Sequence, residues 1–236
     1  MIFYIVVALL FSLTACQSRP FQTATMYDDA SRFVRLEVDP SRGGGHSHPA
    51  AITTEEMIGV LSGVMIEEPP RLVSALSLLI KDDEPRRHPA FSDTEISFFA
   101  PYLAEGLRTA KSEEIVTFGQ TSQKTALLDK VASGGMFVTS GGTFIDGDEL
   151  HFILGNYRSP TNYAPDPGFG ATLDGRSTPL QPIAPQRTEL YFEPITAVSP
   201  SREGLFGSLF RPDRREIVVL FKKLTSRSSD IDHKPN

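Results

Sequence analysis

The sequence has few of the features that mark common classes of protein. It contains a single cysteine, so the chain cannot form an internal disulfide. No apolar run is long enough to span a bilayer, which takes about 20 residues. No repeat of fixed period is visible, which argues against solenoids and propellers. The Gly-x-Ser-x-Gly and His-Glu-x-x-His motifs of many hydrolases and zinc proteases do not occur.

The chain also has no excess of positive charge. Its 23 Lys and Arg residues against 29 Asp and Glu residues give a net charge of −6. Proteins that bind nucleic acid need a basic face for the phosphates, so this balance argues against nucleic acid as a partner. With 40% hydrophobic and 22% charged residues, the composition is that of an ordinary globular protein with a real core.

The N-terminus is the most informative part of the chain. Residues 1–13 form an uncharged apolar run that is too short to cross a membrane. They lead into Leu13-Thr14-Ala15-Cys16. This pattern resembles the lipobox of bacterial lipoproteins, in which the cysteine becomes lipidated. The resemblance implies a signal peptide over residues 1–15 and a lipid anchor at Cys16. Stable anchoring takes two or more acyl chains, such as palmitate, because one chain binds only marginally.

The same resemblance predicts the location of the protein. A lipidated Cys16 places it in the cell envelope, attached to a membrane through its lipid. Gln17, rather than Asp, follows the cysteine. In a Gram-negative bacterium this residue resembles the signal for the outer membrane, with the body facing the periplasm. The alternatives are a plain secreted protein and a short buried N-terminal helix.

The rest of the chain predicts a tether, one folded domain and a tail. Residues 16–30 are mostly polar and predict a tether. Residues 31–224 predict a single globular α+β domain, with an antiparallel or mixed sheet mainly from the C-terminal half and N-terminal helices packed on one face. Residues 225–236 are polar and predict a disordered tail.

Two capping boxes mark the helices. Thr53 with Glu56, and Ser92 with Glu95, have the spacing at which each side chain bonds the other residue's backbone N–H. The apolar spacing extends the first helix through Val64 and Met65 towards two prolines. The second helix contains Pro101, before which we expect a kink or break.

Apolar alternation and turn residues mark the strands. The clearest hairpin joins residues 136–145 to residues 149–157 through Asp146-Gly147. Residues 217–221 are apolar on both faces, which predicts a central position in the sheet. Shorter strands are expected at residues 33–38, 115–118 and 190–192.

One pair of histidines could serve as metal ligands. His46 and His48 lie in a loop that follows three glycines, and histidine is the commonest ligand of transition metals. A site needs a third ligand, which His88, His151 or an acidic residue could supply if the fold brings it close. The alternative is a solvated loop without a ligand.

The irregular C-terminal half holds the predicted contact surface for a partner. Residues 159–186 are rich in proline yet contain apolar side chains, and residues 204–210 are apolar and glycine-punctuated. The candidate contact residues are Tyr163, Phe169, Leu205, Phe206 and Phe210. The alternatives are that the first segment covers the protein's own sheet and that the second plugs its core.

These observations give a ranked set of functions. The leading hypothesis is a non-enzymatic lipoprotein that binds or scaffolds another envelope protein. The second is a lipoprotein that binds a metal or small ligand through the loop of His46 and His48. The third is an envelope hydrolase. No cofactor is predicted, and no stretch of the chain identifies catalytic residues.

Overall fold

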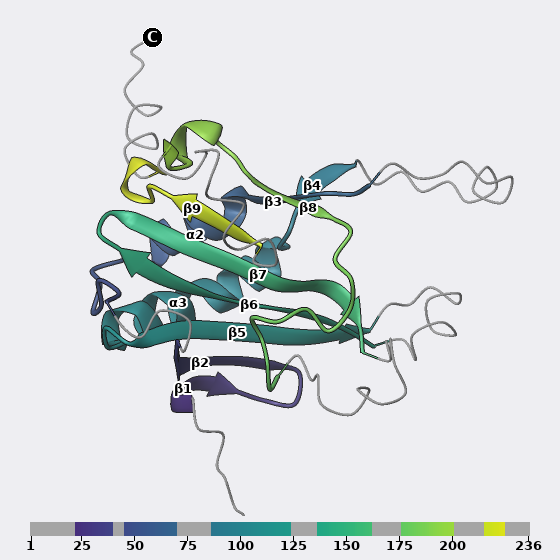
Figure 1. Cartoon of the computed structure of the whole chain (residues 1–236), viewed down its shortest axis with the longest axis horizontal. Coiled ribbons are helices and arrows are strands. Elements are labelled where there is room, and N and C mark those ends of the chain that lie inside the picture. Colours follow the sequence, from purple (N-terminus) through teal and green to yellow (C-terminus); the bar gives the residue numbers. More distant parts are fainter. Residues whose placement is uncertain are drawn as a thin grey trace, which may run out of the picture.

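The computed structural model describes residues 22–39, 45–69, 86–123, 136–161, 176–200 and 215–224. In these residues the chain has an α+β fold with a six-stranded antiparallel sheet, helices on one face of it, and a smaller three-stranded sheet (Figure 1). The predicted fold class is therefore confirmed. The helices are α2 (Thr54–Gly63), α3 (Asp93–Thr109) and the 3-10 turn η2 (Ile195–Ala197).

The large sheet has the strand order β1-β2-β5-β6-β7-β9, and every neighbouring pair is antiparallel. The small sheet has the order β4-β3-β8. The strands are β1 (Gln22–Asp28), β2 (Arg32–Val38), β3 (Val64–Glu67), β4 (Arg87–Pro89), β5 (Glu114–Gln123), β6 (Met136–Asp146), β7 (Glu149–Pro160), β8 (Glu189–Phe192) and β9 (Glu216–Val219).

The hairpin of β6 and β7 lies where the sequence predicts it. Asp146 pairs with Glu149, so Gly147 and Asp148 form a two-residue turn between them. Gly147 has a φ of 62°, a left-handed conformation that glycine adopts without a steric penalty. The hairpin therefore forms from local preferences of the backbone.

Strand β9 corrects one prediction. It lies at an edge of the large sheet, next to β7, and not at the centre. Val198 forms a bridge with Val219, and Leu220 N–H donates to the carbonyl of Ala197. A preceding segment of the chain thus covers the edge, which explains why an edge strand is apolar on both faces.

Both predicted capping boxes are present in the structure. The Thr53 and Ser92 side chains each accept a hydrogen bond from the backbone of the paired glutamate, and each glutamate side chain accepts one in return. The break expected before Pro101 is wrong, because α3 continues as one helix to Thr109. Buried side chains on both sides of the proline hold this helix against the sheet, and packing outweighs the lost backbone hydrogen bond.

Helix α2 ends earlier than the apolar spacing predicts. It stops at Gly63, and the next four residues form β3, which pairs with β4 and β8. A Cβ at Gly63 would lie 2.4 Å from the ring of Phe192 on β8. The glycine thus lets β8 approach closely, and pairing with two strands takes the following apolar residues out of the helix.

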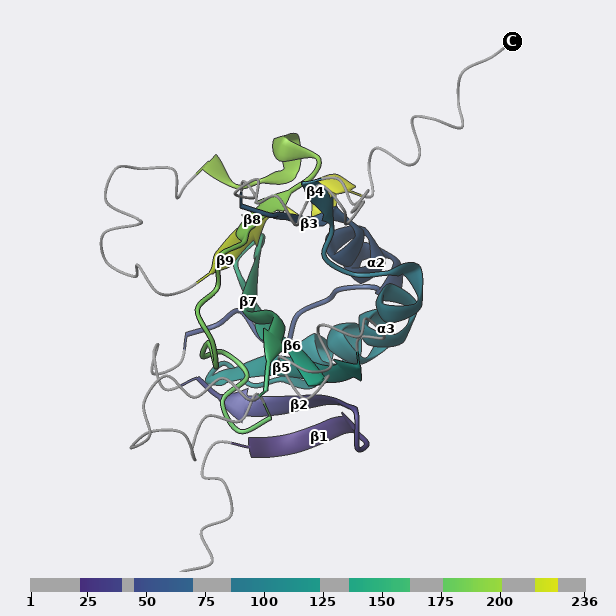
Figure 2. The ribbon, with the colours of Figure 1, turned by 90° about the vertical axis from the view of Figure 1, so that its right-hand side faces the viewer.

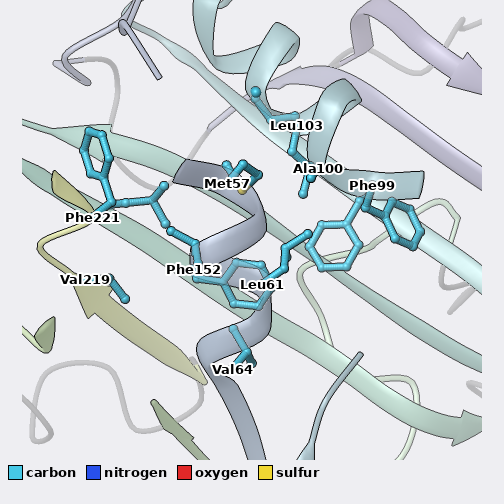
Figure 3. Packing of buried hydrophobic residues seen from close by; sticks show 14 of the residues in the cluster. Met57, Leu61, Val64, Phe99, Ala100, Leu103, Phe152, Val219 and Phe221 are labelled. Atoms are coloured by element: carbon cyan, nitrogen blue, oxygen red, sulfur yellow. The ribbon is translucent and has the colours of Figure 1, made fainter. Parts of the chain in front are cut away.

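The main core lies between the helices and the inner face of the large sheet. Figure 3 shows Met57 and Leu61 of α2 and Leu103 of α3 directed towards side chains of β7 and β9. Phe118 of β5 and Phe152 of β7 stack with ring centroids 5.6 Å apart beneath these helices. Alternate residues of the strands therefore build this layer, as the period of a strand requires.

The outer face of the sheet is covered by an extended segment, residues 176–188, which we name the strap (green in Figure 2). The carbonyl of Pro179 accepts a hydrogen bond from Ser140 Oγ at 3.0 Å. The Asn156 side chain donates to the carbonyl of Gln181 at 2.8 Å and accepts from Ile183 N–H at 2.8 Å. These bonds fix the strap to β6 and β7 and leave the outer face largely closed to solvent.

A glycine makes room for the strap. A Cβ at Gly155 of β7 would lie 2.5 Å from the carbonyl oxygen of Pro179, which real Cβ atoms do not tolerate. Beside it, Leu180 packs on a second small cluster formed by Ile115, Phe144 and Ile153. The strap is therefore built into the fold, with Ile183 and Ala184 among the buried residues.

The N-terminal boundary of the domain also differs from the prediction. Residues 22–28 lie within the expected tether but form β1, which pairs with β2. Two register irregularities interrupt this pairing. Among the described residues, no helix is both long and apolar enough to cross a membrane. The predicted signal peptide and tail lie outside the described residues.

The contact between the strap and Gly155 can be tested by adding one methyl group at this position. Gly155→Ala should lower the free energy of unfolding by about 1–3 kcal/mol, because the strap backbone must shift to admit the Cβ. Gly59→Ala is the control, since its Cβ would meet Leu224 at an ordinary 3.6 Å. Alanine there should stabilise the helix by about 0.5–1 kcal/mol. Urea unfolding measures both, and an unchanged Gly155→Ala variant would contradict this placement of the strap.

Candidate functional site on the outer face

The loop with His46 and His48 is tied to the end of the large sheet. His46 N–H donates to the carbonyl of Ser112 at 2.9 Å, and Ser47 N–H donates to the carbonyl of Ile145 at 2.8 Å. The backbone N–H of Ile145 in turn donates to His48 Nε2 at 3.0 Å. The loop is therefore held by hydrogen bonds to β6 and to the turn before β5, which differs from the solvated loop considered as the alternative.

His46 and His151 both contact the ring of Phe144. The ring centroids of His46 and Phe144 are 4.2 Å apart, and those of Phe144 and His151 are 4.3 Å apart with an angle of 9° between the planes. Phe144 and His151 are also cross-strand partners in β6 and β7. Both histidines are buried. The three rings form one stack on the outer face of the sheet.

A carboxylate accompanies each histidine of the stack. Asp39 Oδ2 lies 3.4 Å from His46 Nε2, and Glu216 Oε1 lies 2.5 Å from His151 Nδ1. Asp39 is 1% exposed, so its carboxylate has almost no contact with water. Carboxylates at such depth require polar partners. His151 forms a hydrogen bond with Glu216, whereas His46 approaches Asp39 Oδ2 without forming one.

The site does not assemble a nucleophile of the serine–histidine type among the described residues. Ser199 Oγ donates a hydrogen bond to Glu149 Oε1 and not to a histidine. The other oxygen of Glu149 lies 4.0 Å from His151 Nε2, and both His151 and Ser199 are buried. A nucleophile needs a base within hydrogen-bond reach, and here a carboxylate lies between the hydroxyl and the imidazole.

The hydrogen bonds define the chemical state of His48. Because Ile145 donates to Nε2, this nitrogen is unprotonated and the proton of the neutral ring is on Nδ1. Burial, and after it the neighbouring His46, lowers the pKa of His48 from 6.5 to about 4. His48 therefore stays neutral at physiological pH and acts as a fixed acceptor for the backbone.

The geometry gives little support to the metal hypothesis. The His46 and His48 ring centroids are 5.5 Å apart, and Nε2 of His48 already accepts a hydrogen bond. His151 stacks on Phe144 and forms a hydrogen bond with Glu216, and His88 is on β4 of the small sheet. In the parts of the chain that the structure describes, no group of three or more His, Cys, Asp or Glu residues is placed to hold a metal ion.

The predicted partner surface can be placed only in part. Residues 176–186 form the described C-terminal part of the segment 159–186, and they belong to the strap. For these residues the alternative interpretation is observed: the segment covers the protein's own sheet. The lipidation site and the candidate contact residues lie outside the described residues: Cys16, Tyr163, Phe169, Leu205, Phe206 and Phe210.

His151 is among the residues considered as a third ligand, but the sequence does not predict its contacts with Phe144 and Glu216. His151 sits between apolar residues of β7 that face the core, so alternation alone places it on the outer face. Glu216, which directly precedes an apolar run, pairs with Ile153 in the register of β7 and β9, so its side chain reaches His151 diagonally across the two strands. The alternation of side chains along a strand predicts the face of the sheet on which each residue lies. Only the order and register of the strands determine which residue it contacts there.

The low pKa of His48 makes a prediction about pH. Between pH 6.5 and about 4 the unfolded chain binds a proton at His48 that the folded protein does not, so stability should fall as the pH falls through this range. His48→Gln keeps an acceptor for Ile145 N–H but does not titrate. Urea unfolding at several pH values should show a shallower decline for this variant and nearly equal stability at pH 7. Parallel declines of the two proteins would contradict the assignment.

Comparison of the chain with protein-family models, with curated proteins and with solved structures found no match.

Proposed function

We propose that this protein is a lipoprotein of the cell envelope, anchored to a membrane through Cys16, that acts as a non-enzymatic binding or scaffolding component. The observation that carries the proposal is Leu13-Thr14-Ala15-Cys16 at the end of an apolar run. It resembles a lipobox, and it accounts for the only cysteine of the chain. In a Gram-negative bacterium, Gln17 favours the outer membrane, with the body in the periplasm.

The position of the first strand supports an anchored body. β1 begins at Gln22, so only residues 17–21 separate it from Cys16. A fully extended chain advances at most ~3.6 Å per residue, so the six steps from Cys16 to Gln22 reach at most about 22 Å. The folded domain would thus lie close to the membrane, as suits a component that presents a surface at one fixed place.

The use of the polar residues supports binding rather than catalysis. His46, His48 and His151 take part in hydrogen bonds, ring contacts and close contacts with carboxylates within the fold. Ser199 is buried and bonded to a carboxylate. These groups stabilise the outer face, and the partner we propose is another protein of the envelope. Its contacts with Tyr163, Phe169, Leu205, Phe206 and Phe210 stay a prediction.

Lipidation can be tested directly. The protein produced in a Gram-negative host should sediment with the membrane fraction, and mass spectrometry should find the mature chain starting at an acylated Cys16. Cys16→Ala should leave the protein unprocessed or release it from the membrane, because the acyl chains have no other attachment point. An unmodified Cys16 in the mature protein would overturn the anchoring hypothesis.

Scaffolding can be tested by capture from solubilised membranes with a tag after Asn236. The wild type should retain one or more envelope proteins, and Phe206→Asp with Phe210→Asp should lose them, because a charge in an apolar contact is costly to bury. Ile195→Asp is the control, since Ile195 is 68% exposed and lies outside the predicted surface. Retention by all three proteins alike, or by none, would contradict this part of the proposal.

A further inference from the structure

The short chain between Cys16 and Gln22 limits which face of the domain can approach the membrane. Its reach of at most about 22 Å is smaller than the width of the large sheet, in which five gaps of ~4.8 Å separate β1 from β9. In both Figure 1 and Figure 2, β1 lies at one end of the molecule and the small sheet of β3, β4 and β8 lies at the opposite end. An anchor at Cys16 therefore holds the β1 end close to the bilayer.

This end of the molecule carries an aromatic group that is only partly buried. Tyr27 of β1 contacts Phe98 and Tyr102 of α3, with ring centroids 4.9 and 5.1 Å apart. The guanidinium of Arg32 lies 3.8 Å from the centre of the Phe98 ring. All four side chains are intermediate in burial. We name Tyr27, Arg32, Phe98 and Tyr102 the anchor-side group.

The chemistry of the anchor-side group matches the headgroup region of a bilayer. Tyrosine gathers at membrane interfaces because its ring is apolar and its hydroxyl is polar. Arginine lays its stem along apolar surface and directs its charge towards phosphate. The group thus combines a cation, which suits lipid phosphate, with partly buried aromatic rings, which suit the upper acyl chains.

Two acidic residues at the turn between β1 and β2 are already engaged by the protein. Asp28 forms an ion pair with Arg176 of the strap. Asp29 accepts hydrogen bonds from the Tyr27 hydroxyl and from the backbone N–H groups of Ser31 and Arg32. Their negative charges are thus held within the β1–β2 turn and the strap, which reduces their repulsion of lipid phosphates.

We propose that the anchor-side group docks on the headgroup layer of the membrane that holds Cys16, so that β1 faces the lipid and the small sheet faces away from it. This inference rests on the proposed function, because it requires an anchor at Cys16. The occupant is the lipid surface itself. Docking fixes the orientation of the domain and leaves the small sheet exposed to the aqueous compartment.

The chain contains no tryptophan, so a single introduced tryptophan reports on one place. The mature chain from Cys16 to Asn236 is attached through its only cysteine to a maleimide lipid in vesicles of phosphatidylethanolamine and phosphatidylglycerol that contain brominated lipid. In the Tyr102→Trp variant, attachment should shift the emission to shorter wavelength, and the brominated lipid should quench it.

Tyr191→Trp is the matched control. Tyr191 lies on β8 of the small sheet, is also intermediate in burial, and also has an arginine over its ring, with Arg87 at 4.4 Å. Its emission should be unaffected by attachment. Adding Arg32→Glu to Tyr102→Trp should reduce the quenching, because the added carboxylate repels lipid phosphate. Equal quenching of the two tryptophan variants, or quenching of neither, would overturn the docking proposal.

The chemical attachment separates this test from the proposed function. It places a lipid at Cys16 whether or not cells do so. Quenching confined to Tyr102→Trp, together with an unmodified Cys16 in cells, would support the docking face and refute the lipoprotein assignment. An acylated Cys16 together with equal quenching would support the lipoprotein assignment and refute the docking face.

Discussion

Both faces of the large sheet must be covered by other parts of the chain, and the rest of this structure depends on this constraint. Helices α2 and α3 bury the inner face, and the strap buries the outer one. An extended segment has no internal hydrogen bonds, so its backbone must bond to the sheet below it. Ser140 and Asn156 supply these bonds, and Gly155 gives the strap room to lie close. Carboxylate side chains such as those of Asp39 and Glu216 can therefore be largely buried on the outer face, where they would otherwise contact water.

The stack of His46, Phe144 and His151 continues this cover past the end of the strap. Each imidazole fills apolar space beside Phe144 and turns a nitrogen towards a carboxylate. Buried pairs of this kind contribute little net stability compared with apolar residues of equal size, but removing one partner is costly. They fix the loop before α2 and strand β9 in one arrangement, so the histidines have a structural role that limits their use as metal ligands.

The structure and the proposed anchor combine into one spatial arrangement. With β1 near a membrane, the large sheet would extend away from the lipid towards the small sheet of β3, β4 and β8. A partner would then meet the domain on the side that faces the aqueous compartment. This arrangement suits a scaffold, because a tether shorter than the width of the sheet restricts how far the domain can turn.

Elements that depend on neighbours a few residues away could be predicted from the chain alone. The capping boxes at Thr53 and Ser92 and the turn at Gly147 form through bonds and backbone angles that span up to three residues. For the same reason the hairpin of β6 and β7 was predicted correctly. The pattern Leu13-Thr14-Ala15-Cys16, which resembles a lipobox, is also local, and this explains why the strongest functional hypothesis comes from the sequence.

Features that depend on distant residues needed the folded molecule. The edge position of β9 follows from its pairing with β7 and Val198, and the end of α2 follows from the approach of Phe192 to Gly63. The role of His48 depends on Ile145, which lies 97 residues further along the chain. Periodicity shows which face of an element is buried, whereas only the packing of elements in space decides what that face contacts.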